Sequence, residues 1–152
     1  MASHKDELKD HEVFYSCLGS RVGRGKDLFI KVDHQYPIDF ATIAKDVGCK
    51  AYFLVSSGGA KANSWNLYLK TKGQVEDDLK EMGLSNLKIL RPGLLLSRDN
   101  DSRIGEKIAA WIPFIPKISC EDVARGMLEY AYDIVSENVT KDPETLDNSK
   151  HP

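Results

Sequence analysis

The chain has 152 residues, of which 41% are hydrophobic and 29% are charged, a composition typical of one globular domain. Its formal net charge of −2 excludes the strong basic field that drives sequence-independent binding to nucleic acid. The amino terminus is too charged for a signal peptide, and no apolar stretch approaches the ~18 residues of a membrane span. We therefore expect a soluble cytoplasmic protein, with the nucleus as a second location, and no nucleic-acid partner.

Cysteine and histidine are sparse and scattered. The three cysteines, Cys17, Cys49 and Cys120, are odd in number and far apart, which favours reduced thiols over a disulfide scaffold. The four histidines lack the cysteine or carboxylate spacing of a zinc site. The sequence therefore predicts no metal site.

The amino-terminal part of the chain reads as a leader, a strand, a loop and a helix. Residues 1–11 form a polar leader, and the apolar run 12–18 predicts the first strand. Residues 19–27 then predict a loop. A helix is expected over 33–48, with Asp33 as its cap rather than as a catalytic acid, because Pro37 suits a first turn and apolar residues follow at helical spacing.

The middle of the chain predicts a strand, a helix and another strand. Residues 50–55 form a short apolar run between glycines, which indicates a buried strand. A helix follows, beginning at Asn63 or Ser64 and ending at Gly83, and residues 86–91 predict a third strand. Trp65 then falls at a helix start, where it covers the core or, as the alternative, lines a substrate pocket.

The last third of the chain has fewer signals. A short helix is expected over 102–111, and Ser119 to Asp122 resemble a capping box at the start of a longer helix. From residue 136 to 152 the chain is polar, and we expect a flexible tail. The folded domain therefore spans 12–135.

Strands that alternate with helices predict an α/β fold with a parallel sheet and flanking helices. Only three main strands are expected, although residues 12–18 are apolar enough for a central position in such a sheet. That strand would expose an unpaired apolar edge. We therefore expect the chain to dimerise through the edge strand 12–18, unless the leader covers it.

Ser57, Tyr68 and Lys72 are the candidate catalytic residues. Tyr68 and Lys72 are four residues apart on a predicted helix, so both lie on one face. A nearby ammonium favours the phenolate form of a tyrosine and so makes it a useful acid–base group. Ser57 follows the strand 50–55, at the sheet edge where ligands bind in open α/β folds. Its hydroxyl can hydrogen-bond the substrate oxygen during hydride transfer.

The Tyr-x-x-x-Lys pair alone carries little weight, because roughly half of one such match is expected by chance in a chain of this composition. The order of strand, serines, loop and helix supplies the context that the chemistry needs. The competing interpretation is that Tyr68 packs against the strand and Lys72 is a solvated surface lysine. The sequence leaves both interpretations open.

Several short motifs occur together in a fixed order: Cys17-Leu-Gly-Ser20, Gly48-Cys-Lys50, Ser56-Ser57, Tyr68-x-x-x-Lys72-Gly-x-Val-Glu76, Arg91-Pro-Gly93 and Ser102-Arg103-x-Gly-Glu106. In this order they resemble a known family, the atypical short-chain dehydrogenases of the Tat-interacting-protein oxidoreductase type. The resemblance covers about residues 5–132, which look like the carboxyl-terminal two thirds of a member.

The resemblance implies a partial Rossmann-type, doubly wound sheet that binds NADP or NAD, with Ser57, Tyr68 and Lys72 at the catalytic positions. Lys72 would also hold the nicotinamide ribose, and Pro92 would lie against the nicotinamide. Leu18, Gly19 and Ser20 match the turn on the adenosine side. The resemblance also allows a non-catalytic regulatory role through protein partners, in transcription, nuclear transport or cell survival.

The sequence departs from the family at its start, because it lacks the strand, the Gly-x-x-Gly-x-x-Gly turn and the further βα units that precede the strand 12–18. The turn is where backbone amides would cradle the cofactor pyrophosphate. Loop 19–27 has the wrong glycine spacing for a phosphate loop and is better interpreted as a surface loop. Two hypotheses remain: an incomplete, weakly active or inactive oxidoreductase, and a non-catalytic binding protein.

Overall fold

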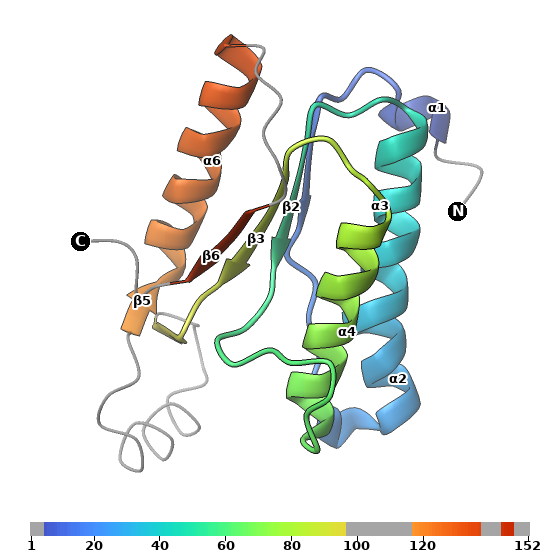
Figure 1. The fold of residues 1–152 in the computed structure, drawn as a ribbon, viewed down its shortest axis with the longest axis vertical. Helices are drawn as coiled ribbons and strands as arrows, with labels where there is room; N and C mark the ends of the chain where they lie inside the picture. The colour runs from blue at the N-terminus through green and yellow to red at the C-terminus, as the bar shows by residue number, and fades with distance from the viewer. Residues whose placement is uncertain (1–4, 97–116, 138–143, 148–152) are drawn as a thin grey trace.

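The computed structural model describes residues 5–96, 117–137 and 144–147 (Figure 1). The predicted helix 102–111 and the motif Ser102–Glu106 lie outside these residues. The elements, in chain order, are α1 (Lys5–Leu8), β1 (Val13–Ser16), the 3-10 turn η2 (Val22–Arg24), α2 (Lys26–Ile30), the π-helical turn η3 (Lys31–Gln35), α3 (Tyr36–Asp46), β2 (Ala51–Val55), α4 (Leu67–Glu81), β3 (Leu87–Arg91), β4 (Leu94–Leu96), β5 (Lys117–Ser119), α6 (Cys120–Glu137) and β6 (Glu144–Asp147).

In the described part of the chain, four strands form the main sheet in the order β1-β2-β3-β6, and every neighbouring pair is parallel. A separate parallel pair joins β4 and β5. Helices α3 and α4 cover one face of the main sheet, and α6 covers the other (Figure 1). The predicted α/β fold with a Rossmann-type parallel sheet is therefore confirmed.

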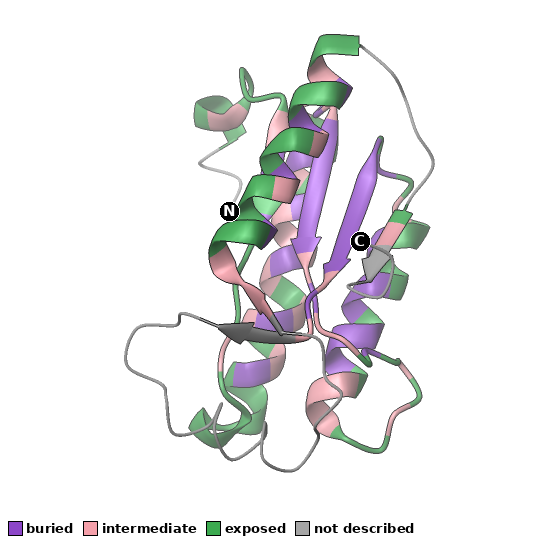
Figure 2. Cartoon of the chain, turned by 90° about the vertical axis from the view of Figure 1, so that its left-hand side faces the viewer, coloured by how far each residue is buried: buried purple, intermediate pink, exposed green. Residues whose placement is uncertain are grey.

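Strand β2 shows why the apolar run 50–55 folds as it does. Successive side chains of a strand point to opposite faces. Tyr52 and Leu54 accordingly pack in the core under α3 and α4, whereas Ala51 and Phe53 pack under α6. Both faces of the strand are buried, which gives the solid purple strands of Figure 2. A strand covered on both sides needs apolar residues throughout rather than alternation.

The first long helix begins earlier than the sequence analysis predicted. Residues 26–46 are helical without a break, through α2, η3 and α3, so much of the expected loop 19–27 is turn and helix. The start is set by Gly25, which has a φ of 117° and whose carbonyl accepts the Phe29 N–H at 3.0 Å. Asp33 lies inside this helical run and is buried, so its prediction as a helix cap is wrong.

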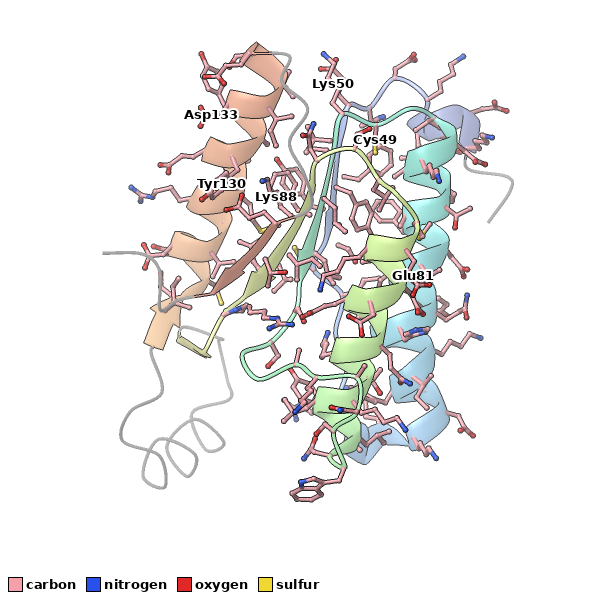
Figure 3. All side chains as sticks on the ribbon, in the orientation of Figure 1. Cys49, Lys50, Glu81, Lys88, Tyr130 and Asp133 are labelled. Carbon is pink, nitrogen blue, oxygen red and sulfur yellow. The ribbon has the colours of Figure 1, made fainter. Side chains whose placement is uncertain are left out.

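Residues 144–147 form β6 beside β3, although the sequence analysis predicted a flexible tail without a strand from residue 136. A tertiary interaction fixes this polar strand. Lys88 of β3 is almost fully buried, and its Nζ lies 2.6 Å from Oε2 of Glu144. The same ammonium lies 5.8 Å from the centre of the Tyr130 ring, and Figure 3 shows Lys88 and Tyr130 between β3 and α6.

The leader is partly structured as well. Residues 5–8 form α1, where Lys5 pairs with Asp46 of α3 at 3.0 Å and Leu8 packs against the core cluster. Within the described residues, β1 pairs with β2 only, and no strand from the leader pairs with its other edge. All three cysteines are free, with Cys49 buried and Cys17 exposed.

Candidate active site

The carboxyl ends of β1, β2 and β3 lie at one edge of the sheet because the three strands are parallel. Leu18, Gly19 and Ser20 follow β1, Ser57 follows β2, and Pro92 follows β3. The fold therefore brings the segments that contain these predicted residues to the same edge. Helix α4, which carries Tyr68 and Lys72, follows the loop that leaves β2.

Ser57 lies between two residues whose backbone positions are fixed. The Ser56 N–H donates to the Leu90 carbonyl at 2.7 Å, and the Gly58 N–H donates to the Pro92 carbonyl at 2.8 Å. The Ser57 hydroxyl itself has a long contact of 3.3 Å with the Gly58 carbonyl. Such a weak local contact leaves this hydroxyl able to turn toward a substrate oxygen.

Tyr68 lies in the first turn of α4. Asn66 caps the helix by accepting the Leu69 N–H at 3.2 Å, so the helix starts later than Asn63 or Ser64. The Tyr68 ring is partly buried, with its centre 5.9 Å from that of Phe29 in α2. Trp65 falls in the preceding loop and is 96% exposed, so the preference for a core position was wrong.

Lys72 is buried and paired, rather than solvated. Its side chain is 5% exposed, and Nζ lies 2.8 Å from Oδ1 of Asp33, whose side chain is 1% exposed. Lys72 lies one turn after Tyr68 on the same face of α4. The solvated-lysine interpretation is therefore wrong, while the catalytic role of Lys72 stays a prediction.

Asp33 is a site residue that the sequence analysis missed. Its Oδ2 accepts the Ser20 N–H at 2.7 Å, so Asp33 joins the loop after β1 to the lysine of α4. A signal for it exists in the sequence. Asp33 falls within an i, i+4 stripe whose other members are apolar and buried, namely Phe29, Pro37 and Ala41. An acidic residue at such a position predicts a buried partner.

Glu76 is a second buried carboxylate that the sequence analysis missed, although it falls within a quoted family motif. It is 0% exposed, accepts the Ser56 hydroxyl, and receives the Arg91 guanidinium, whose Nε lies 3.0 Å from Oε1 and 3.1 Å from Oε2. Arg91 Nη2 also contacts Oε2. Glu76 therefore links α4 to the ends of β2 and β3.

The loop between β2 and α4 packs directly on the helix at Gly73. A Cβ added there would lie 2.1 Å from the Ala62 nitrogen and 2.3 Å from the Lys61 carbonyl carbon. The Lys61 N–H also donates to the Leu69 carbonyl at 3.0 Å. Only glycine permits this approach, which sets the path of the loop between Ser57 and Tyr68.

A buried hydroxyl at this edge lies beside the pair that Asp33 forms with Lys72. The Ser20 hydroxyl oxygen is buried and has no hydrogen-bond partner among the described residues, and it belongs to the residue whose amide binds Asp33. A buried hydroxyl without a partner calls for a polar ligand or water. Within the same described ranges, no group of three or more metal-ligating side chains occurs.

Comparison with solved structures gives the class of fold. The fold matches MoeE5 in complex with UDP-glucose and NAD, with a TM-score of 0.70 and 13% identity over 94% of this chain and 58% of that one. A dTDP-4-dehydrorhamnose reductase from Clostridium acetobutylicum gives a TM-score of 0.68, with 18% identity over 96% of this chain and 59% of that one. The chain thus has the Rossmann-type fold of short-chain dehydrogenase-like reductases and epimerases.

Sequence comparison then gives the relatives. The chain is 43% identical over 103 residues to protein HTATIP2 of Rattus norvegicus, which covers 67% of this chain and 43% of that protein. It is 34% identical over 141 residues to the mitochondrial protein FMP52 of Candida albicans, covering 84% and 61%. The chain is a homologue of HTATIP2 and FMP52, which confirms the family resemblance. No protein-family model matches it.

The chain spans less than half the length of rat HTATIP2 and 61% of the Candida protein. The fungal relatives are named as mitochondrial, which differs from the predicted cytoplasmic or nuclear location. In the part of the chain that the structure describes, no helix is both long and apolar enough to cross a membrane.

Proposed function

We propose that this chain carries the catalytic residues of an NAD(P)-dependent, short-chain dehydrogenase-like oxidoreductase that interconverts a carbonyl and an alcohol. The observation that carries the proposal is the buried Lys72, held by Asp33 one turn from Tyr68 at the carboxyl edge of a parallel sheet. Removing a lysine and its carboxylate partner from water costs free energy, and buried ion pairs of this kind next to a tyrosine are typical of functional sites.

The residues divide the work of carbonyl reduction. A bound NAD(P)H supplies the hydride. Tyr68 donates a proton to the carbonyl oxygen, and the Ser57 hydroxyl hydrogen-bonds the same oxygen as negative charge develops there. Lys72 has ammonium hydrogens left for ribose hydroxyls after pairing with Asp33. Ser20, which follows β1, and Pro92, which follows β3, lie on the two sides of the segment that carries Ser57.

The 152-residue chain alone is expected to bind NADPH only weakly, and so to turn over slowly or not at all. The sequence contains no Gly-x-x-Gly-x-x-Gly turn to hold the pyrophosphate. Isothermal titration calorimetry with NADPH should therefore give no saturable heat below ~1 mM, equivalent to a binding free energy weaker than about −4 kcal/mol. A dissociation constant in the micromolar range would contradict this expectation.

The alternative role is binding and regulation through the exposed edge of the sheet. We propose that two copies pair through β1, whose outer edge has no strand partner among the described residues. The Glu12 carbonyl accepts hydrogen bonds from the N–H groups of Lys50 and Ala51. Because the backbone groups of successive residues in a strand point to alternate sides, those of residues 13 and 15 point away from β2. Tyr15, which stacks on Phe53 at 5.0 Å, is partly exposed there.

Replacing Tyr15 with proline is expected to convert the dimer to a monomer. Proline removes the outward N–H while leaving the hydrogen bonds from β1 to β2 in place. Tyr15→Val is the matched control, because it removes the ring and keeps the N–H. Light scattering at ~100 μM, well above a micromolar dissociation constant, should show a dimer for the wild type and for Tyr15→Val. A wild-type monomer at that concentration would contradict the pairing.

A further inference from the structure

Helix α4 presents three functional groups one turn apart on the same face: Tyr68, Lys72 and Glu76. The proposed reaction uses the first two. Glu76 is the most deeply buried of the three, with no exposed surface, and its carboxylate faces the ends of β2 and β3 rather than solvent.

The Glu76 carboxylate receives donors from two strand ends. The Ser56 hydroxyl donates to Oε1, and the Arg91 guanidinium binds both oxygens through Nε and Nη2. A two-point contact between arginine and a carboxylate fixes direction as well as distance. Ser56 and Arg91 therefore hold fixed positions relative to α4, and α4 carries Tyr68 and Lys72.

Ser57 lies directly after Ser56 and before Gly58, whose N–H is bound by the Pro92 carbonyl at 2.8 Å. Pro92 in turn follows Arg91. The backbone on both sides of Ser57 is thus connected to Glu76, through Ser56 on one side and through Arg91 and Pro92 on the other. We propose that Glu76 is a positioning residue that holds the Ser57 hydroxyl in register with Tyr68.

This inference rests on the proposed role of Ser57, but its geometry can be tested separately. Taking the Glu76 carboxylate out of water beside the partly buried Arg91 guanidinium stabilises a fold no better than apolar residues of the same size. A positioning role accounts for the arrangement, since the pair connects three elements at one point. It also predicts faster hydrogen exchange of the amides on either side of Ser57, a local effect that a loss of overall stability alone does not produce.

Hydrogen exchange measured by NMR tests the geometry. In Glu76→Gln, the exchange of the Ser56 and Gly58 amides should rise at least ~10-fold relative to the Tyr52 amide, which lies deeper in β2. Glu81→Gln is the control, because Glu81 lies on the outer side of the same helix and is exposed (Figure 3). This control should leave all three amides unchanged.

A double variant separates positioning from stability. Glu76→Gln with Arg91→Met removes both charges, so the midpoint of denaturation should recover toward that of the wild type. Hydrogen exchange at the Gly58 amide should nevertheless remain fast, because the contact that connects α4 to the Ser57 segment is absent. The proposal is overturned if the Gly58 amide exchanges as slowly in Glu76→Gln as in the wild type. It is also overturned if the double variant regains both its stability and the slow exchange of the Gly58 amide.

Turnover gives an independent readout in any chain context that shows reductase activity. Glu76→Gln should lower kcat while KM stays within ~2-fold, and in a Ser57→Ala background it should lower kcat by less than ~2-fold more. If the losses of kcat caused by Glu76→Gln and Ser57→Ala multiply in the double variant, Glu76 acts independently of Ser57 and the proposed role is overturned. If no chain context that binds NADPH shows turnover, the proposed function fails, and the exchange experiment still decides whether Glu76 positions the segment.

Discussion

Replacing Asp33 with asparagine is expected to lower the free energy of unfolding by about 3–5 kcal/mol, the cost of breaking a buried ion pair by removing one partner. The Lys72 ammonium would stay buried without its counter-charge, since both side chains are almost inaccessible to solvent. Asparagine can still accept the Ser20 N–H, so the variant tests the charge more than the hydrogen bond. Chemical denaturation with urea measures the loss.

Two further variants make the Asp33 result specific. Asp27→Asn, on the exposed side of the same helical run, should change the free energy of unfolding by less than about 1 kcal/mol. Asp33→Asn combined with Lys72→Met removes both charges and should recover most of the lost stability. A single Asp33→Asn variant as stable as the wild type would show that the pair does not form in solution.

Replacing Gly73 with alanine is expected to cost about 3 kcal/mol or more, because the new methyl group would overlap the backbone of Lys61 and Ala62. Backbone atoms at 2.1 Å cannot turn aside as the end of a flexible side chain can, so the loop between Ser57 and Tyr68 must move. The variant should therefore also disturb the relative positions of the two predicted catalytic residues.

Gly126→Ala is the matched control for this clash. Gly126 lies inside α6 with no atom near its added Cβ, so alanine there should stabilise the protein by up to about 1 kcal/mol through helix propensity. Thermal unfolding of the two variants side by side gives the comparison. A Gly73→Ala variant that gains stability as Gly126→Ala does would contradict the close packing of loop and helix.

Local signals were sufficient for much of the fold. The solid apolar run of β2 predicts a strand covered on both faces, and Gly83 predicts the end of α4, which stops at Glu81 before a φ of 64° at Gly83. Ser119 also caps the start of α6, as its place in the sequence suggested: its hydroxyl accepts the Asp122 N–H at 3.0 Å and donates to the Asp122 carboxylate at 2.7 Å. Each of these features depends on residues close together in the chain.

The features that the sequence analysis missed depend on contacts between distant residues. Strand β6 is polar and is held by the contact of Glu144 with Lys88, which is 56 residues away in the chain. Asp33 and Glu76 were overlooked because an acidic residue on a helix is usually solvated, and burial became evident only with Lys72 and Arg91 beside them. An acidic residue within an apolar stripe was the available signal.

The rate of NADPH oxidation with a panel of small carbonyl compounds shows whether Tyr68 is the catalytic acid, when it is measured in rat HTATIP2 whose matched segment is replaced by the matching residues of this chain. We predict turnover that falls at least ~100-fold in Tyr68→Phe, the usual scale of acid–base catalysis, while the affinity for NADPH stays within a few-fold. Turnover that is unchanged by Tyr68→Phe, or a folded chimaera that binds NADPH without turnover, would contradict the account.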